Sequence, residues 1–266
     1  MVNTKLDGVK VLFFVIFACK SVDPAPEDLD GLIHYFWDNF DETDATIQMG
    51  IVNFHNQIEG DKLTEIIDGS VTKLNEEQTS MVGKPDSQTE QLSGVFFANV
   101  VNCPLASIEK NIYALNQEEL HPDTYDEYSR IHTSDLNAYE AREESTISWE
   151  TNYSISGFGY AYEAQINGTL RYVTTQQESP FGPVLLSRSV LNAPAYFDED
   201  SDRRGMFQDF QMEMYYERSP GESIHLYAIW REMVMAGSID FSSESSQRLV
   251  LDGLVEWDVD MENSCQ

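Results

Sequence analysis

The clearest alternation of hydrophobic and polar positions runs over residues 206–258 and predicts two strands followed by a helix. Apolar side chains occupy every second position for most of 206–216 and again over 224–230, as in half-buried strands. The intervening Ser219-Pro220-Gly221-Glu222 has the composition of a tight turn. Over residues 243–258 the apolar spacing changes to three and four, which predicts the buried face of a helix.

Further strands are predicted upstream of this unit. A short apolar strand covers residues 95–101, and alternating segments at 147–155 and 158–166 form a meander. Asn167-Gly168 predicts a hairpin turn, with residues 170–175 returning from it, and another strand follows over 184–190. Pro104 opens a predicted helix over 105–115, whereas residues 125–131 are predicted to be helical or irregular. The total is about seven strands.

The N-terminal third has a helical pattern. Apolar side chains keep a three-four spacing over residues 29–40 and 47–58, which predicts a helical hairpin, and a short helix is expected over 75–82. The polar stretch 84–93 is the predicted linker. We therefore expect an N-terminal helical extension over 28–83 and a sheet-plus-helix domain over 94–266.

The first residues have the pattern of an export signal. Lys5 and Lys10 precede an apolar run over 11–18, which is too short to span a bilayer. The run ends in Ile16-Phe17-Ala18-Cys19, which resembles the lipobox of bacterial lipoproteins. That resemblance implies cleavage of residues 1–18, acylation of Cys19, a tether over 19–27, and a place in the bacterial cell envelope, at the outer membrane facing the periplasm or the surface. A buried N-terminal strand with an incidental cysteine is the alternative.

Removal of residues 1–18 and acylation of Cys19 would leave Cys103 and Cys265 as an even pair. Thiols in an oxidising compartment can form disulfides, so we expect these two cysteines to be bonded. Such a bond requires their Cα atoms to lie within about 7 Å.

The chain is strongly acidic, with a formal net charge of −30. Nucleic acid is therefore not an expected partner, because binding to phosphates needs cationic groups. The charge favours a basic protein partner or metal cations, or it simply solvates the surface. A calcium-loop pattern at Asp198, Asp200, Asp202 and Asp209 carries Arg203 where such a loop needs glycine, so a solvated acidic loop is the favoured interpretation.

The order of elements carries a second resemblance. Residues 95–101, 105–115, 146–233 and 243–258 follow the order of the START-like, or helix-grip, superfamily, in which a curved antiparallel sheet wraps around a C-terminal helix. The resemblance implies an α+β fold, a curved antiparallel sheet packed on that helix, with the N-terminal helical hairpin as an addition. It also implies a cavity between sheet and helix that receives an apolar ligand.

Aromatic and methionine side chains are the candidates for lining such a cavity. The predicted ligand-binding residues are Trp149, Tyr160, Tyr162, Met212, Met214, Trp230, Leu254 and Trp257. No catalytic or cofactor-binding motif occurs in the sequence, so neither an enzymatic activity nor a cofactor is predicted. We expect a membrane-anchored lipoprotein that binds a lipid or another hydrophobic ligand; the alternative is a structural or protein-interaction domain with a filled core and an acidic surface.

Overall fold

The computed structural model describes residues 24–122, 124–157, 160–176, 179–197, 204–235 and 240–265. The predicted signal peptide, Cys19 and most of the tether lie outside these ranges. So do Asp198, Asp200 and Asp202, three of the four calcium candidates.

An antiparallel sheet of nine strands within the described ranges is the centre of the fold, against the seven or so predicted. Its order is β1-β2-β9-β8-β6-β5-β4-β3, and β7 pairs with β8. The strands are β1 (Ile67–Val71), β2 (Ser93–Val101), β3 (Glu127–His132), β4 (Thr146–Gly157), β5 (Tyr160–Val173), β6 (Val184–Leu191), β7 (Ala195–Tyr196), β8 (Gly205–Ser219) and β9 (Glu222–Val234). The turn between β8 and β9 has Gly221 at φ +80°, a conformation that glycine adopts without strain.

Most of the described helices begin at a short polar side chain that satisfies free backbone N–H groups. Asp28 caps the first helix, Asn75 and Gln78 form a capping box on the third, and Ser243 caps the last. The helices are α1 (Leu29–Asp38), α2 (Asp44–Gln57), α3 (Glu76–Ser80), α4 (Leu105–Tyr113), α5 (Gln117–Leu120), α6 (Leu136–Glu140) and α7 (Glu244–Ser264), with short 3-10 turns η1 (Gly60–Lys62) and η2 (Thr89–Gln91).

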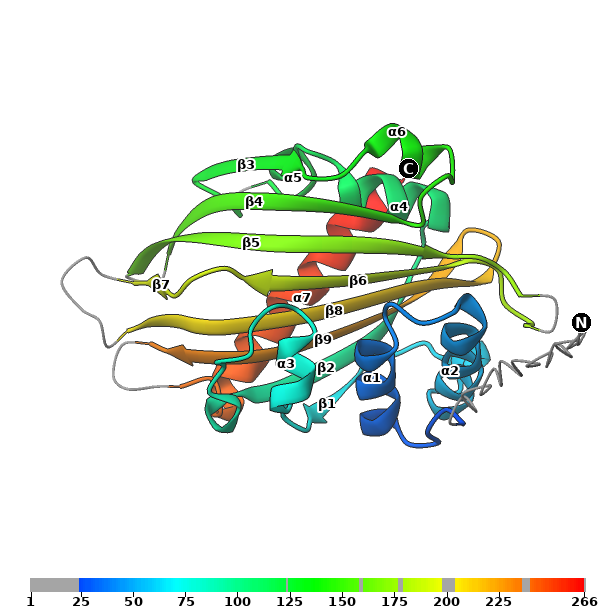
Figure 1. Cartoon of the computed structure of the whole chain (residues 1–266), viewed down its shortest axis with the longest axis horizontal. Helices are drawn as coiled ribbons and strands as arrows, with labels where there is room; N and C mark the ends of the chain where they lie inside the picture. The colour runs from blue at the N-terminus through cyan, green and yellow to red at the C-terminus, as the bar shows by residue number, and fades with distance from the viewer. Residues whose placement is uncertain are drawn as a thin grey trace, which may run out of the picture.

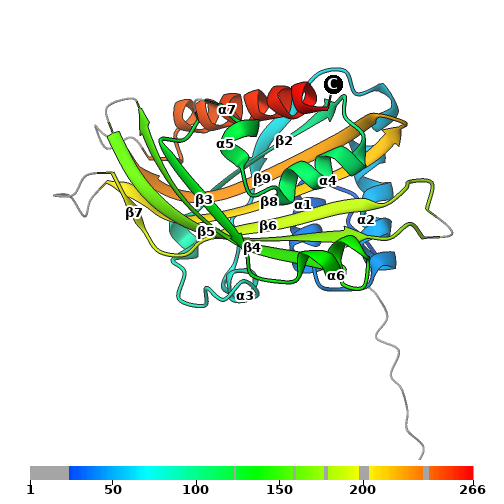
Figure 2. The same ribbon diagram turned by 90° about the horizontal axis from the view of Figure 1, so that it is seen from above.

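Helices cover both faces of the sheet. Helix α7 crosses one face, toward which the strands curve, and α1, α2 and α3 lie against the other face (Figures 1 and 2). A curved antiparallel sheet that wraps around a long C-terminal helix is the helix-grip arrangement, and the predicted fold class is confirmed. Below, the face under α7 is called the concave face and the face under α1–α3 the convex face.

The convex face is filled by a hydrophobic core that α1 and α2 share with the central strands. The rings of Trp37 and Trp230 meet edge to face with centroids 5.4 Å apart, and both side chains are fully buried. Salt bridges add to this contact, at 2.6 Å between Arg171 and Asp44 and at 2.8 Å between Arg188 and Asp41. The N-terminal helices therefore share one core with the sheet.

The same N-terminal region also contributes a strand that the sequence did not predict. Strand β1 pairs with β2 over its whole length, from Ile67 opposite Ala98 to Val71 opposite Gly94. The predicted linker over 84–93 is held in place as well, since Lys84 Nζ donates a hydrogen bond of 2.6 Å to the carbonyl of Asn192. Residues 28–83 are thus part of the sheet-containing unit.

Two local predictions were wrong. Asn167 and Gly168 lie inside β5, paired with Glu150 and Trp149 of β4, and do not form a hairpin. A Cβ on Gly168 would lie 2.3 Å from the Trp149 ring, so glycine is needed there to make room for the indole. Residues 127–132 form the edge strand β3, whose alternation is carried by Tyr128, Arg130 and His132 instead of aliphatic residues.

None of the helices in the described ranges combines the length and the apolar character needed to cross a bilayer.

Candidate ligand-binding cavity

A cavity of about 300 Å³ lies between the concave face and α7. Its walls come from α4, α5, β3, β4, β5, β6, β8, β9 and α7. The lining residues are Ile112, Gln117, His121, Tyr125, Tyr128, Arg130, Trp149, Thr151, Tyr153, Ile155, Tyr162, Ile166, Ser187, Ser189, Gln211, Glu213, Tyr215, His225, Tyr227, Ile229, Arg231, Leu249, Val250, Gly253, Leu254, Trp257, Asp258 and Met261.

The predicted ligand-binding residues divide between the two faces. Trp149, Tyr162, Leu254 and Trp257 line the cavity. The other described side chains, Met212, Met214 and Trp230, are buried in the convex core with α1 and α2, so the structure places them away from the cavity. The side chain of Tyr160 lies outside the described part of the structure.

The placement of the two methionines follows from strand geometry. Successive side chains of β8 point to opposite faces, so Met212 and Met214 face the helical hairpin while Gln211 and Glu213 face α7. An irregularity between Met206 and Gln208 shifts the register, and Met206 accordingly packs in the core under α7. The apolar face that the sequence marks most clearly is therefore not the face that holds the cavity.

Four polar side chains form the floor of the cavity on the central strands β6 and β8. Ser187 is opposite Glu213, and Ser189 is opposite Gln211, in two successive cross-strand pairs on the same face of the sheet. Burial raises the pKa of Glu213, and the nearby Asp258 adds to the shift, while His225 and Arg130 oppose it. We call Ser187, Ser189, Gln211 and Glu213 the polar floor.

A buried histidine–aspartate pair connects the sheet to α7. Nδ1 of His225 on β9 lies 2.7 Å from Oδ1 of Asp258 on α7, and Asn99 donates to Oδ2 of the same carboxylate at 3.1 Å. The His225 ring stacks on Tyr215 with centroids 4.0 Å apart, and its Nε2 is buried without a hydrogen-bond partner among the described residues. This pair fixes the position of α7 over the polar floor.

Asp209 forms a buried ion pair with Arg231. Its carboxylate accepts hydrogen bonds from Arg231 at 2.8 and 3.2 Å and from the Gln211 amide nitrogen at 2.7 Å. Burial alone would lower the pKa of Arg231, but the Asp209 charge and hydrogen bonds outweigh burial and raise it. Asp209 is thus not free to serve as a calcium ligand, and the described ranges contain no cluster of three or more residues suited to hold a metal ion.

At the β3 edge the cavity has an arginine and a group of tyrosines. Arg130 donates to Thr151 Oγ1 at 2.9 Å and to the carbonyl of Ile112 at 2.7 Å, and its guanidinium lies 4.8 Å from the Trp149 ring centroid. Burial lowers the pKa of Arg130. The rings of Tyr125, Tyr128, Tyr153 and Tyr162 follow one another at centroid distances of 4.8 to 6.1 Å.

Two glycines shape the cavity in opposite ways. Gly168 lets the Trp149 indole lie across β5, as described above. Gly253 lies in the middle of α7 and lines the cavity, and a Cβ there would meet nothing within 4 Å. The volume beside Gly253 is therefore open space that a side chain could fill.

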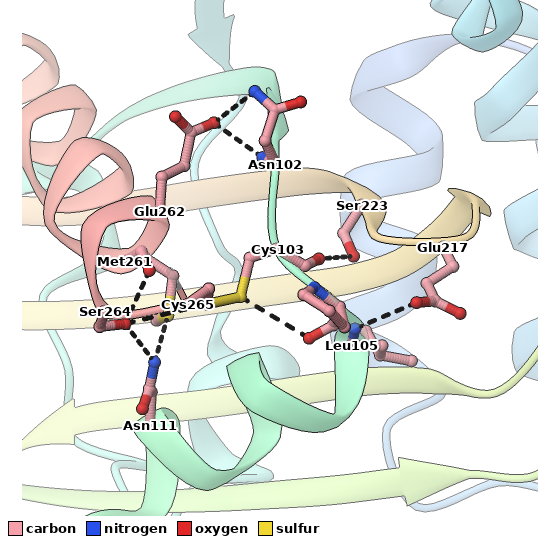
Figure 3. The surroundings of a disulfide bond; sticks show 11 residues. Asn102, Cys103, Leu105, Asn111, Glu217, Ser223, Met261, Glu262, Ser264 and Cys265 are labelled. Carbon is pink, nitrogen blue, oxygen red and sulfur yellow. Dashed lines mark hydrogen bonds between the residues drawn. A yellow bond between two sulfur atoms is a disulfide. The ribbon is translucent and has the colours of Figure 1, made fainter.

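The structure contains the predicted disulfide between Cys103 and Cys265, with Cα atoms 5.6 Å apart (Figure 3). Around it, Asn102 donates two hydrogen bonds to Glu262 at 2.7 and 2.9 Å, and Asn111 donates to Ser264 at 2.7 Å. The C-terminal end of α7 is thus fastened to the segment between β2 and α4.

No family model matches this sequence, and no curated protein matches it. Solved structures that resemble it include the human StarD13 (DLC2) lipid transfer and protein localization domain, at 11% identity over 81% of this chain and 96% of that chain, with a TM-score of 0.43. Human STARD10 is 11% identical over 77% of this chain and 72% of that chain, with a TM-score of 0.44.

A third is dicamba monooxygenase bound to 3,6-dichlorosalicylic acid, 10% identical over 66% of this chain and 50% of that chain, with a TM-score of 0.43. At such identities and scores, the likeness is confined to the arrangement of sheet and helices.

Proposed function

We propose that this protein binds a small, largely apolar molecule bearing polar groups in the space between α7 and the concave face. The observation that carries the proposal is a cavity of about 300 Å³, at the lower end of the range for ligand sites, in which aromatic walls surround a few convergent polar groups. A filled core is the alternative and describes the convex face, whereas the open space under α7 supports ligand binding on the concave one. The sequence motifs give no support to catalysis, so the proposed role is binding.

The composition of the walls narrows the kind of ligand. Val250, Leu254 and Met261 on α7 offer aliphatic contact from above, while the polar floor offers hydrogen-bonding groups from below. A ligand with an apolar body and a polar end would satisfy both surfaces, whereas a plain hydrocarbon would leave the floor unsatisfied at a cost in free energy.

A variant that fills the cavity tests the proposal. Gly253→Trp places an indole in the open space beside α7, and Gly253→Ala is the matched control that leaves most of the space free. We expect the neutral apolar fluorophore N-phenyl-1-naphthylamine to bind the parent protein and Gly253→Ala, and Gly253→Trp to bind it at least about tenfold more weakly. Circular dichroism and the urea midpoint establish that each variant is folded.

Equal probe affinity in a folded Gly253→Trp variant and in the parent would overturn the proposal. Ser189→Trp, which fills the same cavity from the floor, provides a second blocked variant should Gly253→Trp not fold. Native mass spectrometry of the purified protein provides an independent measurement, since a bound apolar molecule would add mass that Gly253→Trp lacks.

We further propose that an acyl chain on Cys19 anchors the protein in the bacterial cell envelope. The support is the sequence motif Ile16-Phe17-Ala18-Cys19 with its preceding apolar run. Cys19→Ala is expected to abolish acylation and to release the protein from the membrane fraction. A variant that stays in the membrane fraction would contradict the anchor.

A further inference from the structure

The polar floor has more hydrogen-bond acceptors than the protein itself uses. The side-chain nitrogen of Gln211 donates to Asp209, so its amide oxygen remains as an acceptor toward the cavity. The Glu213 carboxyl and the Ser187 and Ser189 hydroxyls have no hydrogen-bond partner among the described residues. An ionised carboxylate and an amide oxygen can only accept, and a hydroxyl can accept as well. The floor is therefore complementary to a group with several donors.

The charges around the cavity leave one carboxyl without a partner. Asp258 is paired with His225, and Asp209 outside the cavity lining neutralises Arg231. Of the carboxyl groups that line the cavity in the described residues, Glu213 is the one without an ion pair. The charges of His225 and Arg130 act on Glu213 but neither side chain is bonded to it, since His225 is bonded to Asp258 and Arg130 to Thr151 and to backbone carbonyls. A buried carboxylate without a counter-charge is stabilised by a cation.

Aromatic rings flank the polar floor. Tyr227 is the cross-strand neighbour of Glu213 on β9, and Tyr215 follows two residues along β8 on the same face. The Trp149 ring lies across Gly168, whose pairing partner on β6 is Ser189. The electron-rich faces of such rings attract ammonium groups. The Glu213 carboxyl, the hydrogen-bond acceptors and the aromatic rings thus all favour a ligand with an ammonium group.

We propose that the polar floor binds the ammonium group of an organic amine, with Glu213 as its counter-ion and the apolar body of the amine beneath α7. This inference rests on the proposed ligand-binding function and specifies which polar group the ligand carries. One ammonium N–H donates to Glu213, the other two donate to acceptors among Ser187, Ser189 and Gln211, and the rings of Trp149, Tyr215 and Tyr227 surround the group.

A matched series of small molecules tests the inference on the full chain. Tryptamine, 3-ethylindole and indole-3-propionate share one ring system and differ in carrying an ammonium, no charge or a carboxylate; 2-phenylethylamine, ethylbenzene and 3-phenylpropionate repeat the comparison with a smaller ring. Affinities are measured by isothermal titration calorimetry. We expect the amine of at least one set to bind about tenfold or more tightly than its neutral counterpart, as for a charge-assisted hydrogen bond.

Glu213→Gln keeps the size of the side chain and removes its charge. In this variant the preference for the amine should disappear while the affinity for the neutral compound stays within about twofold. Glu163→Gln removes the same charge from an exposed side chain of β5 outside the cavity lining, and as the matched control it should keep the preference.

The outcomes separate the inference from the function on which it rests. Neutral compounds that bind as tightly as amines, a preference for the carboxylates, or an amine preference that persists in Glu213→Gln would each overturn the ammonium site but leave the cavity function intact. Absence of binding by every compound, together with no binding of N-phenyl-1-naphthylamine, would overturn both.

Discussion

The two faces of this sheet are built from the same strands but have different interiors. On β8, Met212 and Met214 point into a core filled by α1 and α2, while Gln211 and Glu213 point into a cavity under α7. Large rings such as Trp37 and Trp230 interdigitate on the convex face. On the concave face α7 spans the sheet with a glycine at its middle, α4 and α5 form part of the walls, and serines occupy the floor. The difference shows that whether a sheet face is solid or hollow depends on the size and packing of the side chains that meet there, and not on the strands.

Removal of the largest ring from the filled face is expected to have the greatest effect. Trp230→Ala should lower the free energy of unfolding by about 3–5 kcal/mol, because the indole is fully buried and packs edge to face on Trp37 of α1. Urea denaturation measures the loss. Trp257→Ala, which truncates a partly buried ring beside the cavity, should cost clearly less, and equal losses would contradict the distinction between the two faces.

Reduction of the disulfide that fastens α7 should have the next largest effect on the free energy of unfolding. Reduction of the Cys103–Cys265 bond, which links positions 162 residues apart, is expected to lower the free energy of unfolding by about 2–4 kcal/mol. Hydrogen exchange should accelerate in α7 and remain slow in α1. The double variant Cys103→Ala/Cys265→Ala should match the reduced protein, and an unchanged urea midpoint after reduction would contradict the prediction.

The charge on the cavity floor should make stability depend on pH. Burial raises the pKa of Glu213 above its ordinary 4.5, so between that value and the raised one the folded state binds more protons than the unfolded state. Stability should therefore fall as the pH rises through this window. His225, Asp258 and Arg130 face the same carboxyl and contribute to the shift, with burial as its main cause.

Glu213→Gln removes the titrating group and should abolish this fall. The variant is expected to gain stability over the parent as the pH rises through that window, because the parent alone loses the proton that burial holds on Glu213. Urea midpoints of both proteins at intervals from pH 4 to about 8 provide the measurement. A constant difference between the two proteins across that range would mean that Glu213 titrates normally.

The smallest expected effect concerns the glycine in α7. Gly253→Ala should raise the free energy of unfolding by about 0.5–1 kcal/mol, since alanine favours the helix and its Cβ meets open space. Gly168→Ala is the opposite case, because its Cβ would collide with the Trp149 ring, and it should destabilise the protein. Thermal unfolding compares the two, and destabilisation by Gly253→Ala would show that the space beside α7 is closed.

Much of the fold could be predicted from the sequence because each element is regular over many residues. The alternation along 206–216 and 224–230 and the three-four spacing in α1, α2 and α7 each reflect one dominant period. The edge strands β1 and β3 were missed because their sequences contain few aliphatic residues among glycine, serine, arginine and histidine. Asn167-Gly168 was misread as a hairpin turn because Asn-Gly is a common turn dipeptide. Here the glycine is needed to make room for the Trp149 ring.

The site was harder to predict than the fold for a related reason. Period two separates the two faces of β8 but does not state which helix covers each of them, and the apolar face belongs to α1 and α2. Polar residues such as Gln211 and Glu213 would face solvent on an uncovered sheet. The polar floor could have been identified from the fact that Gln211 and Glu213 lie opposite Ser189 and Ser187. That pairing is known only once β6 and β8 are known to be neighbours.

The disulfide also sets an order of events during synthesis. Cys265 follows Cys103 by 162 residues, and strands β3 to β9 all lie between them. A ribosome releases the chain from its N-terminus onward, so residues of the filled core from Leu32 to Trp230 emerge before the second cysteine. The disulfide that fastens α7 over the cavity can therefore form only after every strand between the two cysteines has been synthesised.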